Sequence, residues 1–207
     1  MLSVLFSALS LTWLSCLAAA QSPTNLPPAP PGVFTVQNSV LINATLKDVW
    51  DVLTDFPSYP DWNPFLRSIT VADDFFIPTD SQIPQEGHRI ILVTQIPPLT
   101  GPISRNSKGN PLESHYDFDN LTHVQPEQGR IAWKVMGWPD GMLSAERWNA
   151  VSEVTGEDGE KRVLYEYREV FGGALGYFVE EFLGDGLKEG FEAEGKAMKA
   201  RVEGLRD

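Results

Sequence analysis

The sequence predicts an α+β fold in which a curved antiparallel sheet of about seven strands packs around a long C-terminal helix. Residues 129–173 hold three runs of alternating apolar and polar residues, which is typical of an antiparallel meander. Turn-forming residues separate these runs at Pro139-Asp140-Gly141 and at residues 156–159. After Gly173 the apolar spacing changes to three to five residues, which indicates a helix. A helix laid across a curved sheet buries both apolar surfaces and leaves a pocket between them.

One face of the meander mixes large aromatic side chains with an arginine, an amide and a carboxylate. Its residues are Ile131, Trp133, Val135, Ala145, Arg147, Asn149, Val151, Val163, Tyr165, Tyr167, Glu169 and Phe171. A mixed face of this kind is more typical of a cavity wall than of a dry core. We therefore expect a ligand chamber between this face and the C-terminal helix.

The elements before the meander follow from periodicity and from turn residues. Asn43 or Thr45 can cap a first helix, and Pro57 ends it. Apolar and β-branched runs predict the strands. In chain order we expect a strand at 33–42, a helix at 43–56, a short proline-containing helix at 59–65, strands at 66–71, 88–96 and 113–124, and loops at 73–87 and 97–111.

The C-terminal helix is predicted over residues 175–205. Its apolar stripe contains Leu175, Phe178, Val179, Phe182, Leu183, Leu187, Phe191, Met198, Val202 and Leu205. Four glycines interrupt it, at positions 184, 186, 190 and 195, and each costs up to about 1 kcal/mol relative to alanine. Packing against the sheet must offset this cost.

The N-terminus has the pattern of a targeting segment. Residues 1–20 are uncharged and apolar and end in Ala18-Ala19-Ala20, which predicts a signal peptide cut after Ala20. An uncleaved membrane anchor is the alternative, since this length can just span a bilayer. Residues 21–32 are rich in proline and are expected to form a poorly ordered linker before a ligand-binding domain at 33–207. We therefore expect the protein to be secreted or to enter the secretory pathway.

Composition limits the partners. The formal net charge of -12 argues against nucleic acid as a partner. Cys16 is the only cysteine, so the chain after residue 20 has no thiol chemistry. That part of the chain contains no predicted membrane span, and we expect a monomer. The sequons at Asn43 and Asn120 are compatible with glycosylation in a secretory pathway.

No cofactor or metal site is predicted. His115, Asp117 and Asp119 alternate along one face of a strand that we expect to be solvated, and a zinc ion needs three or four convergent ligands. No G-x-S-x-G motif occurs, so Ser-His-Asp catalysis has no support.

Several segments resemble the START-like, or SRPBCC, superfamily, which includes polyketide cyclases and dehydrases and the birch-pollen-allergen-like proteins. The segment from Val49 to Phe65 is similar to the opening motif of that superfamily. Weaker similarities lie at Gly129 to Lys134, Arg168 to Gly173 and Gly190 to Ala193. Together they cover roughly residues 33–205. The resemblance implies a helix-grip fold with two short helices after the first strand and a hydrophobic ligand in the cavity.

Two functions follow from this resemblance. The first is binding of a hydrophobic small molecule, such as a lipid, sterol, quinone or polyketide-like compound, between the sheet and the C-terminal helix. The alternative is a polyketide cyclase or aromatase-like enzyme of secondary metabolism that uses acid–base residues in the cavity. A third possibility is a secreted surface-interaction protein with an empty pocket.

The residues of the mixed face supply the site candidates. If the hairpins pair about their turns, Arg147 lies opposite Trp133 on one side and Tyr167 or Glu169 on the other. Arg147, Glu169 and Tyr167 are the candidate catalytic residues: Arg147 binds an anionic group of the ligand, Tyr165 or Tyr167 donates a proton, and Glu169 acts as a base or orients Arg147. Alternatively, Arg147 forms a purely structural ion pair that neutralises inward charges. The predicted ligand-binding residues are Trp133, Arg147, Asn149, Tyr165, Tyr167, Glu169, Phe178 and Phe182.

Overall fold

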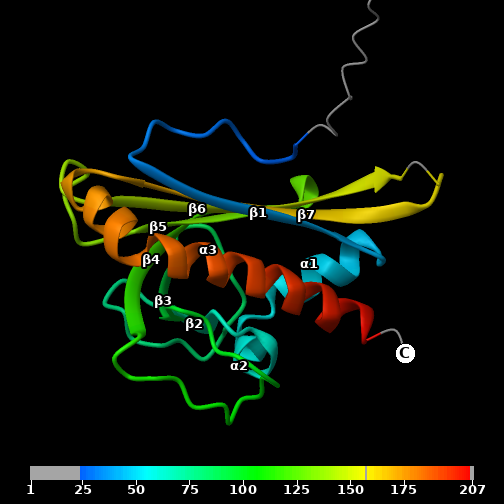
Figure 1. The fold of residues 1–207 in the computed structure, drawn as a ribbon, viewed down its shortest axis with the longest axis horizontal. Helices are drawn as coiled ribbons and strands as arrows, with labels where there is room; N and C mark the ends of the chain where they lie inside the picture. Colours follow the sequence, from blue (N-terminus) through cyan, green and yellow to red (C-terminus); the bar gives the residue numbers. More distant parts are fainter. Residues whose placement is uncertain (1–23, 157, 206–207) are drawn as a thin grey trace, which may run out of the picture.

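The computed structural model describes residues 24–156 and 158–205, and Figure 1 shows its fold. The strands are β1 (Phe34–Ile42), β2 (Leu66–Ala72), β3 (Arg89–Gln95), β4 (Ser114–Gln125), β5 (Arg130–Val135), β6 (Ser144–Thr155) and β7 (Lys161–Gly172). The α-helices are α1 (Leu46–Thr54), α2 (Tyr59–Trp62) and α3 (Ala174–Glu203), and short 3-10 helices lie at η1 (Phe56–Ser58) and η2 (Pro126–Gln128).

Within the described residues, the strands form one antiparallel sheet of seven strands in the order β1-β7-β6-β5-β4-β3-β2. Strands β2 and β3 bend round toward α3, which lies along the concave side of the sheet, and α1 and α2 lie near its C-terminal half (Figure 1). This architecture confirms the predicted α+β helix-grip fold. The apolar interior lies between the sheet and these helices.

Local sequence sets the bounds of α1. The side chain of Thr45 accepts a hydrogen bond from the backbone N–H of Asp48, and the Asp48 carboxylate accepts one from the Thr45 N–H. This reciprocal capping satisfies two backbone donors that the first helical turn leaves free. Helix α1 ends at Thr54, and Pro57 lies at the start of η1.

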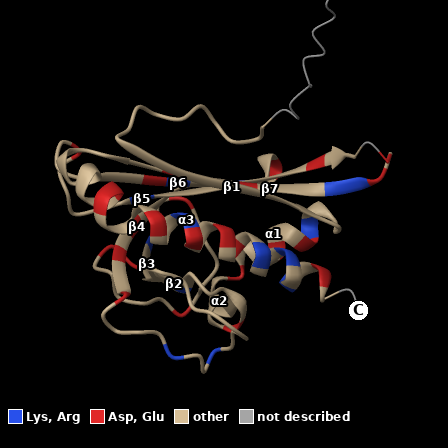
Figure 2. Ribbon diagram, in the orientation of Figure 1, with Lys and Arg blue, Asp and Glu red and all other residues tan. Residues whose placement is uncertain are grey.

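Helix α3 fits closely against the sheet because glycines face its neighbours. A Cβ atom on Gly190 would collide with the ring of Phe65, and one on Gly195 would lie 2.5 Å from the Tyr167 hydroxyl oxygen. The glycines that weaken the helix on its own therefore allow its backbone to approach the aromatic interior. Acidic residues lie along the N-terminal and middle parts of α3 and basic residues near its C-terminus (Figure 2), where the helix dipole favours Arg201 in the last turn.

The proline-rich segment after residue 23 lies over the face of the sheet opposite α3 (Figure 1). It has no regular secondary structure, but hydrogen bonds attach it to the sheet. The side-chain amide of Asn25 donates to the backbone oxygens of Gln128 and Val151 at 2.8 and 2.9 Å. Arg168 Nη2 donates to the carbonyl of Pro27 at 2.7 Å. Residues 24–32 are therefore packed against the domain, whereas a poorly ordered linker was expected there.

The predicted signal peptide, residues 1–20, and Cys16 within it lie outside the described residues. Among the residues that the structure does describe, no helix combines the length and the apolar character needed to cross a membrane.

Candidate functional site

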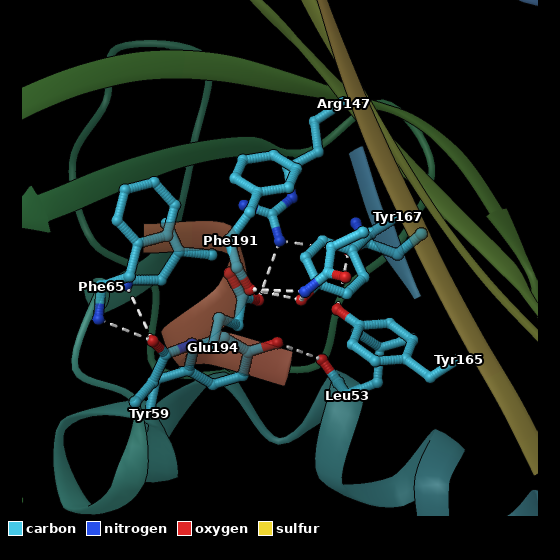
Figure 3. A network of polar contacts seen from close by, with 12 residues as sticks. Leu53, Tyr59, Phe65, Arg147, Tyr165, Tyr167, Phe191 and Glu194 are labelled. Atoms are coloured by element: carbon cyan, nitrogen blue, oxygen red, sulfur yellow. Dashed lines mark hydrogen bonds and ion pairs between the residues drawn. The ribbon is translucent and has the colours of Figure 1, made fainter. Parts of the chain in front are cut away.

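A buried ion pair joins the sheet to α3. Arg147 Nη2 on β6 donates to Glu194 Oε1 on α3 at 2.8 Å, and the two side chains are 2% and 1% exposed (Figure 3). The sequence placed Arg147 opposite Trp133 on one side and Tyr167 or Glu169 on the other, and the structure pairs it with Trp133 and Glu169. The ion-pair partner of Arg147, however, is Glu194 and not Glu169.

Aromatic rings surround the guanidinium. The Arg147 Cζ atom lies 4.7 Å from the ring centroid of Phe191 and 5.4 Å from those of Trp133 and Tyr167. Cation–π contacts of this kind stabilise a charge that has lost its water. Burial is the largest single effect and lowers the pKa of Arg147, but the charges of Glu194, Tyr165 and Glu169, with the hydrogen bond to Glu194, together raise the pKa overall. The arginine is therefore permanently charged, and Glu194 already balances that charge.

The predicted polar residues beside Arg147 form hydrogen bonds within the protein. Tyr165 donates through its hydroxyl to Asn149 Oδ1 at 3.0 Å. Tyr167 donates to the backbone oxygen of Phe191 and accepts from Asn38 Nδ2. Burial raises the pKa of both tyrosines, which makes each hydroxyl a poorer acid. Tyr167, proposed from the sequence as a catalytic proton donor, thus has a structural role here.

A cavity of about 120 Å³ lies between the sheet and the N-terminal half of α3. Most of its lining is apolar, and it includes two of the three predicted catalytic residues, Arg147 and Glu169, together with Trp133. The remaining lining residues are Phe65, Leu66, Leu92, Thr94, Ile96, His115, Asp117, Asp119, Val135, Leu143, Ala145, Phe171, Val179, Leu183 and Leu187. Asn149, Tyr165 and Tyr167 lie deeper in the interior and are not among them.

The polar groups of this cavity come mainly from β4. His115, Asp117 and Asp119 line it, so the expectation that this strand face is solvated was wrong. Their neighbours Tyr116 and Phe118 are the exposed residues of the strand, at 66% and 45%. Strand β4 therefore has its polar side chains inside and its aromatic side chains outside, the reverse of the usual pattern.

A bulge ends this inverted pattern. The register of β4 against β5 shifts between Leu121 and His123. Leu121 is fully buried, whereas the ring of His123 contacts Trp148, which follows the inward-facing Arg147 on β6. One extra residue moves the following side chains to the opposite face of a strand. After the bulge, the apolar side chain of Val124 packs against the core.

Three carboxylates in the cavity have raised pKa values. Burial raises the pKa of Asp117 and, more strongly, that of Asp119, where the charges of Asp117 and Glu169 add to the effect. Burial also raises the pKa of Glu169 to about 7, although Arg147 opposes this shift. Carboxylates that hold a proton near neutral pH can act as general acids, and their ionised forms are stronger bases than ordinary carboxylates. This acidic group, Asp117, Asp119 and Glu169, gives the cavity the means for proton transfer.

Two predicted ligand-binding residues lie outside the cavity. Phe178 and Phe182 are 54% and 67% exposed and contact each other at a ring-centroid distance of 4.4 Å. The side of α3 that faces the cavity carries Val179, Leu183 and Leu187 instead. Assigning Phe178 and Phe182 to the ligand site was wrong because the helix turns them toward solvent.

The two sequons differ in their surroundings. Asn43 is exposed just before α1, whereas Asn120 is half-buried in β4 and accepts a hydrogen bond from Arg89 Nη1 at 2.7 Å. Glycosylation at either position stays a prediction.

Glu194 and the inward face of β4 are the functional residues that sequence reasoning missed. Glu194 follows Phe191 by three residues and precedes Met198 by four, so it lies on the buried stripe of α3. That spacing was a signal for an inward-facing charge. On β4, aromatic and acidic residues alternate, and nothing in the strand itself shows which set faces inward.

The comparisons with known proteins agree with this fold. Residues 33–93 match the family described as polyketide cyclase / dehydrase and lipid transport. The chain is 28% identical over 203 residues to the oxopyrrolidines biosynthesis cluster protein O of Penicillium oxalicum, a match that covers 92% of this chain and 96% of that protein.

Solved structures are similar at low identity. A hypothetical protein from Helicobacter pylori is 14% identical with a TM-score of 0.63, covering 88% of this chain and 99% of that one. The Zhui aromatase/cyclase from Streptomyces is 14% identical with a TM-score of 0.54, over 84% of this chain and 96% of that one. A START superfamily protein from Mycobacterium smegmatis is 18% identical with a TM-score of 0.51, over 83% and 98%. The chain has the fold of these START-like structures, and its residues 33–93 match the polyketide cyclase / dehydrase family, so the comparisons agree with the resemblance seen in the sequence.

Proposed function

We propose that the protein is an acid–base enzyme that cyclises or dehydrates a compact enolisable carbonyl compound in secondary metabolism. The observation that carries this proposal is the acidic group Asp117, Asp119 and Glu169 in a largely apolar cavity, with raised pKa values. Similarity to a biosynthesis cluster protein and to an aromatase/cyclase supports the same class of chemistry.

The proposed reaction consists of proton transfers around carbon–carbon bond formation. An ionised carboxylate, Glu169 in our assignment, removes a proton from the carbon next to one carbonyl, and the resulting enolate carbon attacks a second carbonyl of the same molecule. Protonated Asp117 gives its proton to the carbonyl oxygen, which becomes a hydroxyl. Loss of that hydroxyl with a proton from the neighbouring carbon releases water and leaves a conjugated ring ketone. Each step is general acid–base catalysis, for which the cavity supplies both partners.

The size of the cavity favours a compact substrate. A cavity of about 150 Å³ holds one benzene ring, whereas sites for larger ligands have about 300–1,000 Å³. The 120 Å³ between β4 and α3 therefore fits a single ring or its open-chain precursor. A sterol or long-chain lipid would have to displace α3 from its close contact with Phe65.

Binding without catalysis is the second candidate. Two observations favour it: most residues that line the cavity are apolar, and Arg147 is already paired with Glu194. In that case the protein carries a compact hydrophobic molecule. Under either function we also propose a secreted monomer, in keeping with the predicted signal peptide.

Cyclisation of acetonylacetone to methylcyclopentenone tests the enzyme proposal. This diketone is compact, and its aldol cyclisation and loss of water contain every proposed step. Followed by proton NMR, the full chain should accelerate the reaction over buffer, and Asp117→Asn or Glu169→Gln should reduce that acceleration by about 100-fold.

Asp185→Asn is the matched control, because the Asp185 side chain is 96% exposed on α3. It should leave the rate unchanged. Binding of the diketone with no acceleration by the full chain would reject the enzyme and support the carrier. Equal loss of rate in all three variants would remove the proposed roles of Asp117 and Glu169.

A further inference from the structure

The charges that line the cavity do not balance. Asp117 and Asp119 on β4 and Glu169 on β7 face it with His115, and the positive charge of Arg147 is already paired with Glu194. Three carboxylates thus share the cavity with one imidazole and one neutralised guanidinium. The field inside attracts positive charge and N–H donors, and it disfavours an anionic ligand.

Two buried side chains at this cavity lack partners. Asp119 is 5% exposed and Thr94 is 7% exposed. Within the described part of the chain, neither Asp119 Oδ1 nor Thr94 Oγ1 has a hydrogen-bond partner. Buried polar atoms are nearly always hydrogen-bonded, and leaving one unsatisfied is costly. Both atoms belong to residues that line the cavity, where a ligand can satisfy them.

A metal ion does not fit this arrangement. Among residues 24–156 and 158–205, no three His, Cys, Asp or Glu side chains are placed to hold one ion. Separated carboxylates suit an organic cation better, because its N–H groups point in several directions and its carbon skeleton can contact Leu92, Val135 and Leu183.

We propose that the natural ligand is a compact compound with a protonated amine or several N–H groups, bound by Asp119 with Asp117 and Glu169. The inference rests on the proposed function, because it takes this cavity as the ligand site. It adds the class of substrate, which is a carbonyl compound that also contains a basic nitrogen. Thr94 Oγ1 completes the site as a further hydrogen-bonding group beside the cation.

Pyrrolidinium and tetrahydrofuran make a matched pair of probes. Both are five-membered rings of nearly equal size, but the first carries a charge and two N–H donors and the second only an ether oxygen. We measure the affinity of each for the full chain at about pH 8 from NMR chemical shifts. Pyrrolidinium should bind at least about tenfold more tightly, the ratio expected for one charge-assisted hydrogen bond.

Variants locate the binding. Asp119→Asn should bring the two affinities within about threefold of each other, and Glu169→Gln should reduce the ratio in the same direction. Asp185→Asn should retain the full ratio, because that carboxylate is exposed on α3. Circular dichroism checks that each variant is folded. If Asp119→Asn does not fold, Glu169→Gln still tests whether the carboxylates bind the cation.

Acidification gives an independent readout. Lowering the pH from about 8 to about 6 protonates Glu169, whose pKa is about 7, so pyrrolidinium should bind several-fold more weakly while tetrahydrofuran stays unchanged. His115 and Arg147 also face the group. Equal affinity for the two probes, or a ratio that Asp119→Asn leaves intact, would overturn the inference.

This outcome is separate from that of the diketone assay. Pyrrolidinium does not react, so its binding without diketone turnover would support the ligand class and reject the enzyme. Diketone turnover with no preference for pyrrolidinium would support the enzyme and reject the ligand class.

Discussion

Arg147 on β6 and Glu194 on α3 form an ion pair 2.8 Å long that is almost fully screened from solvent. The pair links the middle of the sheet to the C-terminal helix. Arg147 lines the acidic cavity, but its partner Glu194 is not one of the carboxylates that face the cavity. Arg147 therefore contributes to the site by neutralising Glu194 and by holding α3 in place.

Removing one partner of this pair should strongly destabilise the protein. Glu194→Gln leaves the guanidinium buried without a counter-charge, so we expect a loss of about 3–5 kcal/mol in the free energy of unfolding, measured with denaturant. The double variant Arg147→Met with Glu194→Leu should lose less than Glu194→Gln, because no charge is left buried. The exposed pair Lys47–Asp51 is the control, and Lys47→Ala should cost far less, because water screens an exposed ion pair. A loss no larger than this control in Glu194→Gln would contradict the argument.

Stability should fall as the pH rises through neutrality. The pKa of Glu169 is about 7 in the folded protein and 4.5 for an ordinary glutamate, so between these values the folded state holds a proton that the unfolded chain releases. That stabilisation is complete below about pH 4.5 and is lost above about pH 7, with a size of about 2 kcal/mol after allowance for solvent screening. Denaturant titrations across this range should show a smaller decline for Glu169→Gln. An identical decline in both proteins would show that Glu169 has an ordinary pKa.

A methyl group at Gly190 should separate α3 from the sheet. Its Cβ would overlap the ring of Phe65, so Gly190→Ala should cost about 1–3 kcal/mol despite the better helix propensity of alanine. Gly141→Ala is the matched control, because no atom lies within 4 Å of its added Cβ, and we expect a change within about 0.5 kcal/mol. Thermal unfolding measures both, and stabilisation by Gly190→Ala would disprove the close contact.

The two phenylalanines on opposite sides of α3 should differ in their effects. Phe191 is 1% exposed and contacts Phe65 and Tyr167, so Phe191→Ala should cost about 3–5 kcal/mol. Phe182 is mostly exposed, so Phe182→Ala should cost below about 1 kcal/mol and leave the affinity for pyrrolidinium unchanged. Weaker pyrrolidinium binding in Phe182→Ala would show that Phe182 does contribute to the ligand site.

The sequence predicted the meander best, because its signals are local. Turns at residues 139–141 and 156–159 set the register, which placed Arg147 opposite Trp133 and either Tyr167 or Glu169; the structure has Trp133 and Glu169 there. The same alternation failed on β4, because which face is buried depends on strands that are distant in sequence. Aromatic side chains there face outward, and the acids complete the wall of a cavity that the curved sheet forms only after folding.

Glu194 was missed for a related reason. Its spacing placed it on the apolar stripe of α3, but a charge on such a stripe is tolerated only if a counter-charge arrives from another element. Arg147 comes from a strand 47 residues earlier, and no local pattern connects the two. Glu169 was therefore assigned as the partner because it was the nearest acid in the predicted register.

The binding of residues 24–32 to the outer surface of the sheet has a practical consequence. Cutting the chain at residue 33, where the match to the family begins, would remove Asn25 and Pro27, and with them acceptors for Arg130 and Arg168. A shortened protein of that kind would leave two arginines short of a partner on β5 and β7. Recombinant versions meant for crystals or assays should retain these nine residues, and purification tags placed upstream of them would leave from the side away from the cavity.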